Sequence, residues 1–252
     1  MALMQVRFFS AALGKQAEFQ AIVPQSMDAA KQFKVLYLLH GLSDDSSMWT
    51  RFTAIERYAA SYPLIVIMPD AERSYYTDMK EGARFWTMIS EELPQVVKGF
   101  FHVSERREDT VAAGLSMGGY GALKLALRCP ERFGAVAAFS SAVDPGMLML
   151  EPARATLEPE FRRIFGSLEE LHGSGNDLFH VANTLRRQEA PLPRVRQYCG
   201  AEDFLIAPNR AFRAHLEALA WPDYRYIETP GKAHTWDYWD WCINDALPFL
   251  MA

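Results

Sequence analysis

The feature that most constrains this chain is a Gly-x-Ser-x-Gly pentapeptide at residues 114–118, with a short apolar run before it and a helix-forming run after it. In that setting the pattern is typical of a nucleophile elbow, a sharp turn that joins a strand to a helix. Gly114 and Gly118 are expected there because side chains would collide with neighbouring backbone in so tight a turn. Ser116 is predicted to stand at a helix N-terminus, where free backbone N–H groups favour negative charge.

The glycines of this stretch do not indicate phosphate binding. No Lys-Ser or Lys-Thr pair follows the pentapeptide, so the pattern of a P-loop is missing. The chain also has no Gly-x-Gly-x-x-Gly after a strand, no His-Glu-x-x-His and no cluster of cysteines. We therefore expect neither a nucleotide cofactor nor a catalytic metal. The pentapeptide alone is common, so the strand before it and the helix after it carry the inference.

The length and the charge of the chain limit the classes of protein to which it can belong. With 252 residues the chain fits one large α/β domain over residues 1–252. The net charge is −5 without any basic run, which argues against a nucleic-acid partner, and the 3 scattered cysteines predict no disulfide framework. Because no signal peptide and no membrane-spanning apolar stretch are visible, we expect a cytoplasmic protein that binds no membrane. Homo-oligomers are common, and a homo-oligomer is left open.

Apolar runs alternate with helix-forming runs along most of the chain, which indicates a mostly parallel, doubly wound sheet with helices on both faces. Two strands at residues 5–10 and 16–23 are expected to open the fold as a hairpin. Ligands of parallel sheets bind beyond the carboxyl ends of the strands. The parallel strands are predicted at residues 34–39, 64–68, 110–115, 135–140, 194–199 and 224–228.

Residues 144–193 interrupt this rhythm. Prolines and glycines separate short helical pieces there, such as residues 159–165 and 177–187. We interpret the segment as a helical insertion that covers part of the active-site face. The alternative is an ordinary long crossover that contains two helices.

A serine hydroxyl is a poor nucleophile at neutral pH and needs an adjacent base, which an acid must orient. In this architecture the order along the chain is serine, then Asp or Glu, then His. Asp203 and His234 fit, because each follows a predicted strand by a few residues. Glu202 neighbours Asp203 but is expected to point elsewhere. The remaining candidates lie before the serine, in the insertion or within a helix: His102, His172, Asp177, His180 and His215.

The oxyanion of an acyl-transfer intermediate needs preorganised backbone donors. One donor is predicted to be the N–H of Met117, directly after the nucleophile. The second should come from the loop after the strand at residues 34–39, and we assign it to Leu42. The pair His40-Gly41 would let that loop turn toward Ser116. The alternative is that His40-Gly41 is merely a turn.

Aromatic residues near the predicted strand ends are candidate walls of a substrate pocket. We select Trp236, which follows the predicted base by two residues, together with Tyr75 and Tyr76 in the loop after the strand at residues 64–68. Trp86 and Trp239 are expected to belong to the core instead, because buried aromatic rings are ordinary core residues.

Five motifs resemble the tributyrin esterase group of α/β-hydrolases, which is related to S-formylglutathione hydrolases of the esterase D type and to the mycolyltransferase antigens. The resemblance covers nearly the whole chain and is weakest over residues 144–193. It implies an α/β-hydrolase fold and a serine carboxylesterase that acts on small-molecule esters of short acyl chains, acetyl to butyryl, acetylated sugars among them. The motifs are Leu39-His40-Gly41-Leu42, Glu91-Glu92-Leu93-Pro94, the run from Gly114 to Leu123, the run from Cys199 to Phe204, and the run from Gly231 to Trp236.

Carried over residue by residue, the resemblance implies the triad Ser116, Asp203 and His234 and the oxyanion donors Leu42 and Met117. Two of these motifs depart from the S-formylglutathione hydrolases. These commonly show Gly-Leu-Thr-Cys where this chain has Gly-Leu-Ser-Asp at residues 41–44, and His where it has Leu115. A thioesterase of that type, an acyltransferase and a binding protein on a hydrolase fold are the alternatives to the esterase.

Overall fold

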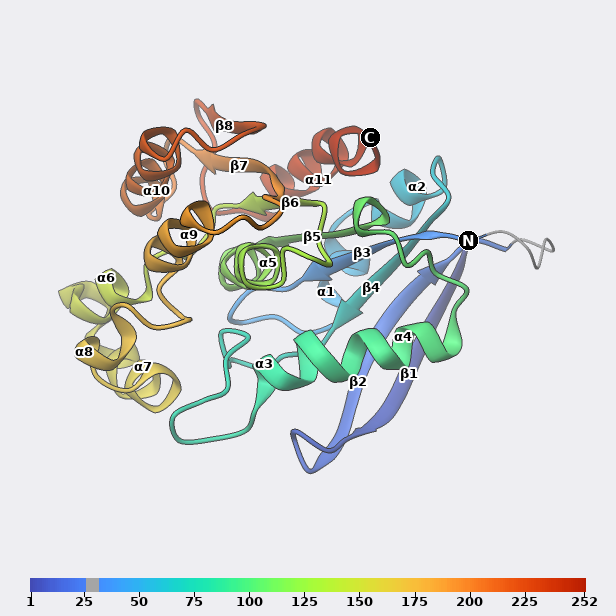
Figure 1. Ribbon diagram of the computed structural model, residues 1–252, viewed down its shortest axis with the longest axis horizontal. Coiled ribbons are helices and arrows are strands. Elements are labelled where there is room, and N and C mark those ends of the chain that lie inside the picture. The colour runs from blue at the N-terminus through green and yellow to red at the C-terminus, as the bar shows by residue number, and fades with distance from the viewer. Residues whose placement is uncertain (26–31) are drawn as a thin grey trace.

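The computed structural model describes residues 1–25 and 32–252. Within them one sheet has the strand order β1-β2-β4-β3-β5-β6-β7-β8 (Figure 1). The hairpin of β1 and β2 pairs antiparallel with β4, and all strands from β4 to β8 in that order run parallel. The predicted doubly wound sheet with an N-terminal hairpin is thereby confirmed. The strands are β1 Ala2–Ser10, β2 Lys15–Val23, β3 Lys34–Leu39, β4 Leu64–Pro69, β5 Thr110–Leu115, β6 Ala135–Phe139, β7 Arg194–Gly200 and β8 Tyr224–Thr229.

Two helical layers cover the sheet, with α1, α2 and α11 on one face and α3, α4, α5, α9 and α10 on the other (Figure 1). Successive side chains of a strand point to opposite faces. In β3, Val35 and Tyr37 accordingly join the core under α4 and α5, whereas Leu36 and Leu38 join the core under α11. The helices of these layers are α1 Met48–Phe52, α2 Ile55–Ala59, α3 Phe85–Thr87, α4 Leu93–Phe100, α5 Met117–Arg128, α9 Leu178–Arg187, α10 Ile206–Ala218 and α11 Trp236–Met251.

A π-helical turn at Met88–Glu92 joins α3 to α4. Pro94 lies in the first turn of α4 and has no backbone N–H, and the wider π turn accommodates that loss within one continuous helix. The turn also presents Glu92, whose carboxylate accepts hydrogen bonds from the Ser10 hydroxyl at 2.5 Å and the Ala12 N–H at 2.8 Å. The N-terminal hairpin is thus fastened to this helix.

Residues 144–193 connect β6 to β7 through a series of short helices. The first four gather beyond one end of the sheet, while α9 returns to lie beside α5 (Figure 1). Across residues 1–25 and 32–252, no helix combines the length and the apolar character needed to cross a membrane. The elements of this segment are α6 Pro145–Leu150, a 3₁₀ turn at Pro152–Leu157, α7 Glu158–Phe165, α8 Leu168–Leu171 and α9.

Candidate active site

The nucleophile elbow has the geometry that its sequence predicts. Ser116 lies between β5 and α5 with φ 53° and ψ −117°, a conformation that costs a non-glycine residue about 1–3 kcal/mol. The fold holds it there, because its N–H donates to the Phe139 carbonyl at 2.9 Å and its carbonyl accepts from Ala142 at 3.0 Å. A Cβ on Gly118 would lie 2.3 Å from the Leu39 carbonyl oxygen, and one on Gly114 would lie 2.4 Å from the Gly118 oxygen. Glycine is therefore required at both positions.

Asp203 and His234 come together from the loops after β7 and β8. Both carboxylate oxygens of Asp203 lie within hydrogen-bond distance of His234 Nδ1, at 2.9 and 3.1 Å. The Asp203 side chain is fully buried, and its Oδ1 also accepts from the Leu205 N–H at 2.8 Å. Because an ionised carboxylate can only accept, Nδ1 carries the proton and Nε2 is left as an acceptor. The arrangement suits a general base at Nε2.

The imidazole of His234 is held between two aromatic rings. The Phe204 ring lies 4.4 Å from it, and the Trp239 ring lies 4.8 Å from it at an interplanar angle of 88°. These contacts restrict rotation of the imidazole, so its Nε2 keeps one direction. Trp239 is itself fixed by a hydrogen bond from its indole N–H to the Ser140 hydroxyl at 3.1 Å.

A pocket of about 380 Å³ joins Ser116 and His234. Leu42 also borders it, and Met117 supplies the first N–H of α5, which has no partner within the helix. The structure thus brings the predicted nucleophile, base and second oxyanion residue to one cavity. The other lining residues are Gly41, Ser43, Asp44, Arg73, Tyr75, Leu115, Ala142, Leu148, Leu157, Phe161, Phe204, Leu205, Trp236 and Trp239.

The predicted pocket aromatics divide into two groups. Tyr75 and Trp236 line the cavity. Trp239 is buried in the core under α11, as expected, and also borders the cavity. Tyr76 does not line it: this side chain is fully buried and donates its hydroxyl hydrogen to the His40 carbonyl at 3.0 Å. Tyr75 and Tyr76 both have positive φ, 51° and 50°, and of these two adjacent residues only Tyr75 borders the cavity.

Several lining residues were missed by the sequence analysis. Arg73 follows β4 and reaches the pocket edge, where its guanidinium pairs with Glu160 of α7 at 2.6 and 2.7 Å. The rule that ligands bind beyond the strand ends could have found Arg73 and Asp44. Leu148 and Phe161 come from the segment at 144–193, where no periodic pattern points to a pocket. Among the described residues, no group of three or more His, Cys, Asp or Glu side chains could hold a metal ion.

Lys124 fixes the loop that carries the pocket residue Tyr75. It is fully buried on α5, and its ammonium donates to the Tyr76 carbonyl at 3.0 Å and to the Thr77 hydroxyl at 2.9 Å. Burial lowers the pKa of this ammonium well below its usual range, while the Trp86 ring at 4.8 Å favours the cation. Lys124 thereby ties the loop that carries Tyr75 to the helix that begins at the nucleophile.

Gly200, at the end of β7, controls the distance between the loops of Asp203 and His234. A Cβ at this position would lie 2.1 Å from the Lys232 carbonyl oxygen, which accepts from the Glu202 N–H at 2.9 Å. We expect Gly200→Ala to push the two loops apart and to lower kcat/KM about 100-fold, because displacements near 1 Å can cost that much. Ester hydrolysis and thermal unfolding should be measured together.

Gly99→Ala is the matched control, since a Cβ there meets nothing within 4 Å. This variant should keep kcat/KM, and its melting temperature should stay the same or rise slightly, because alanine favours the helix α4 more than glycine does. A Gly200→Ala enzyme with undiminished kcat/KM would show that the spacing of the two loops does not matter.

Comparison with known proteins identifies the family of this chain. The model of the Esterase family, described as "Putative esterase", matches residues 10–250. The chain belongs to the Esterase family. It is also 31% identical to an acetyl esterase of Caldicellulosiruptor saccharolyticus, over 99% of this chain and 98% of the relative.

Solved structures agree with this assignment. The substrate-bound fluorophosphonate-binding serine hydrolase F of Staphylococcus aureus matches the esterase with a TM-score of 0.91 and 30% identity, over 100% of this chain and 98% of the other. The S-formylglutathione hydrolase FrmB of Staphylococcus aureus matches with a TM-score of 0.89 and 30% identity, over 100% and 99%. The esterase is therefore a serine hydrolase of carboxylic esters with the α/β-hydrolase fold, as the resemblance of its motifs implied.

Proposed function

We propose that this esterase hydrolyses small esters of short acyl chains, acetyl to butyryl, through an acyl-enzyme on Ser116. The observation that carries the proposal is the Asp203–His234 pair, which borders the same small cavity as the strained serine. In the proposed mechanism His234 Nε2 takes the Ser116 proton while the serine oxygen attacks the acyl carbonyl. The N–H groups of Leu42 and Met117 stabilise the oxyanion, and Asp203 stabilises the imidazolium.

His234 then acts as the acid that completes acylation, and afterwards as the base and acid of deacylation. His234 gives its proton to the departing alkoxide, so the alcohol leaves and the acyl group stays on Ser116. His234 then takes a proton from water, whose oxygen attacks the acyl-enzyme, and returns that proton to Ser116 as the acid leaves. The leaving alcohol must lie beside His234, which places it near Phe204 and Trp239.

The volume of the cavity is compatible with a small ester. Ligand pockets hold about 300–1,000 Å³, and this one, at about 380 Å³, is at the small end of that range. Tyr75, Leu148 and Phe161 line the cavity and supply apolar surface for a short acyl group. The relative named an acetyl esterase points the same way.

Hydrolysis of p-nitrophenyl esters from acetyl to octanoyl tests this proposal. Tributyrin serves as a second substrate, whose leaving alcohol is not activated. We expect kcat/KM to be highest between acetyl and butyryl and to fall at least tenfold by octanoyl, in line with the relative that is named an acetyl esterase. A maximum at octanoyl would overturn the assignment of chain length and leave the ester hydrolase intact.

Thioester hydrolysis is a second candidate, because one matching structure is an S-formylglutathione hydrolase. Asp44 borders the cavity at a position where such enzymes commonly have Cys, and its carboxylate instead accepts from the Gly41 N–H at 3.0 Å. We therefore expect kcat/KM for p-nitrophenyl acetate to exceed that for S-formylglutathione. The reverse order would favour the thioesterase.

A further inference from the structure

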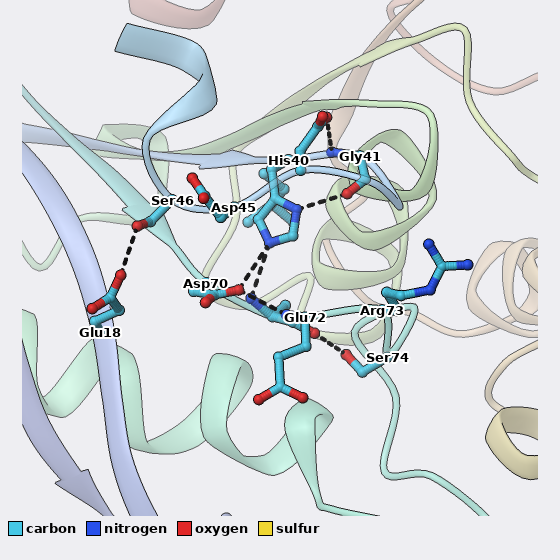
Figure 2. Close-up of polar contacts among 12 residues, drawn as sticks. Glu18, His40, Gly41, Asp45, Ser46, Asp70, Glu72, Arg73 and Ser74 are labelled. Carbon is cyan, nitrogen blue, oxygen red and sulfur yellow. Dashed lines mark hydrogen bonds and ion pairs between the residues drawn. The ribbon is translucent and has the colours of Figure 1, made fainter. Parts of the chain in front are cut away.

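His40 is buried beside the candidate oxyanion loop without lining the cavity. The residue directly follows β3 and is 1% exposed. Its Nδ1 lies 2.7 Å from the Gly41 carbonyl oxygen, and its Nε2 lies 3.0 Å from the Ala71 backbone nitrogen (Figure 2). Both ring nitrogens therefore face backbone groups of two separate loops.

These two neighbours fix the tautomer of the ring. The backbone N–H of Ala71 can only donate, so Nε2 of His40 must be an unprotonated acceptor. A backbone carbonyl can only accept, so Nδ1 carries the proton and donates it to Gly41. Oδ1 of Asp70 also lies 3.5 Å from Nε2, a distance at which it would pair with a protonated ring, and the same carboxylate accepts from the Glu72 N–H at 2.8 Å.

The hydrogen bond to Gly41 sets the direction of the next N–H. In a planar trans peptide the carbonyl and the following N–H point in opposite directions. The Gly41 carbonyl points toward His40 Nδ1 and also accepts from the Asp44 N–H at 3.3 Å. The N–H of Leu42, in the same peptide plane, is therefore directed away from the His40 ring. Both residues that share this peptide, Gly41 and Leu42, border the cavity.

The neighbouring peptide groups are fixed as well. The Tyr76 hydroxyl donates to the His40 carbonyl at 3.0 Å, and the Gly41 N–H donates to Asp44 at 3.0 Å. Rotation of the Gly41–Leu42 peptide is then opposed mainly by His40, because its 2.7 Å bond is the shorter of the two to that carbonyl. A donor held in place before the reaction needs no reorganisation when the oxyanion forms.

We propose that His40 is a positioning residue whose neutral Nδ1–H tautomer, fixed by the Ala71 N–H, aims the Leu42 N–H at the oxyanion. The inference rests on the proposed function, in which Leu42 is an oxyanion donor. It assigns to His40 an effect on kcat without contact to the substrate.

Two substitutions of His40 test its two hydrogen bonds one at a time. In His40→Asn the side-chain nitrogen takes the place of Nδ1 and can still donate to Gly41. In His40→Gln the side-chain oxygen reaches the place of Nε2 and can still accept from Ala71, while the donor to Gly41 is lost. Each variant loses one buried hydrogen bond, so both should lower the melting temperature by similar amounts.

Their kinetics should differ. We expect His40→Gln to lower kcat for p-nitrophenyl acetate about 100-fold with KM nearly unchanged, because loss of one oxyanion donor typically costs about 10²–10³ in kcat. His40→Asn should retain kcat within about fivefold of the wild type. Inhibition by a trifluoromethyl ketone, whose adduct places an oxyanion in the site, should weaken in the Gln variant by a factor similar to its loss of kcat.

Equal losses of kcat in both variants, or a larger loss in His40→Asn, would overturn the proposal. Nitrogen-15 spectra of the wild type give an answer that does not require either variant to fold, since the proposal demands a protonated Nδ1 on His40, and a protonated Nε2 would refute it. If the proposed function itself fails, the wild type will show no ester hydrolysis and no binding of the ketone. That result is distinct from any ratio between the two variants.

Discussion

Replacement of Ser116 by alanine is expected to lower kcat for p-nitrophenyl acetate by about 10³- to 10⁶-fold, the range found when a catalytic serine is removed. The hydroxyl oxygen is the only atom lost, and the backbone bonds to Phe139 and Ala142 remain. The fold should therefore persist, with an unchanged melting temperature. Steady-state hydrolysis and labelling by a fluorophosphonate probe measure the effect together.

The exposed Ser61 provides a matched control for that experiment. Ser61→Ala should hydrolyse the ester at the wild-type rate and take up the probe, whereas Ser116→Ala should do neither. A loss in Ser116→Ala of tenfold or less would remove the acyl-enzyme from the mechanism. An unlabelled wild type would instead favour a binding protein on a hydrolase fold.

Conversion of Asp203 to asparagine is expected to lower kcat by about 10⁴-fold, as the equivalent change does in a serine protease. The amide of asparagine can donate to His234 Nδ1 and so favour the tautomer with its proton on Nε2. That tautomer cannot accept the Ser116 proton, and the imidazolium also loses its negative partner. The bond from the Leu205 N–H to Oδ1 can persist, so the loop should keep its conformation.

Glu202→Gln is the control for this second substitution, because it removes a neighbouring charge from the same loop. Glu202 engages Lys232 through its backbone N–H, a contact that the change leaves in place. We expect its kcat to stay within about threefold of the wild type. Similar losses in the two variants would mean that charge in this loop, rather than the tautomer of His234, governs the rate.

The residues of the candidate site that directly follow strands could be predicted from the sequence, because the positions of the strands determine where these residues lie. Continuous apolar runs located the parallel strands, and the carboxyl ends of such strands meet at one edge of the sheet. Ser116, Asp203 and His234 each follow a strand by a few residues, so their approach could be anticipated. Gly114 and Gly118 could be interpreted because a tight elbow leaves no room for a side chain.

The walls of the cavity were not predictable in the same way. Tyr75 and Tyr76 are adjacent in a loop with positive φ, where neither a helical nor a strand period says which side chain faces the cavity. Leu148, Leu157 and Phe161 come from short helices whose placement depends on tertiary contacts, such as the ion pair between Arg73 and Glu160. Sequence patterns report local periodicity and do not report such long-range contacts.

The proposed catalytic residues and the residues that line the cavity come from different parts of the fold, and this has a consequence for how the enzyme can be re-engineered. The groups that we propose to react follow β3, β5, β7 and β8, whereas Leu148, Leu157 and Phe161 belong to a segment outside the sheet. Exchange of that segment for one of different length or bulk should therefore alter substrate preference while leaving the reaction chemistry in place. Directed evolution toward longer acyl chains has a natural target there, with the elbow and its glycines held constant.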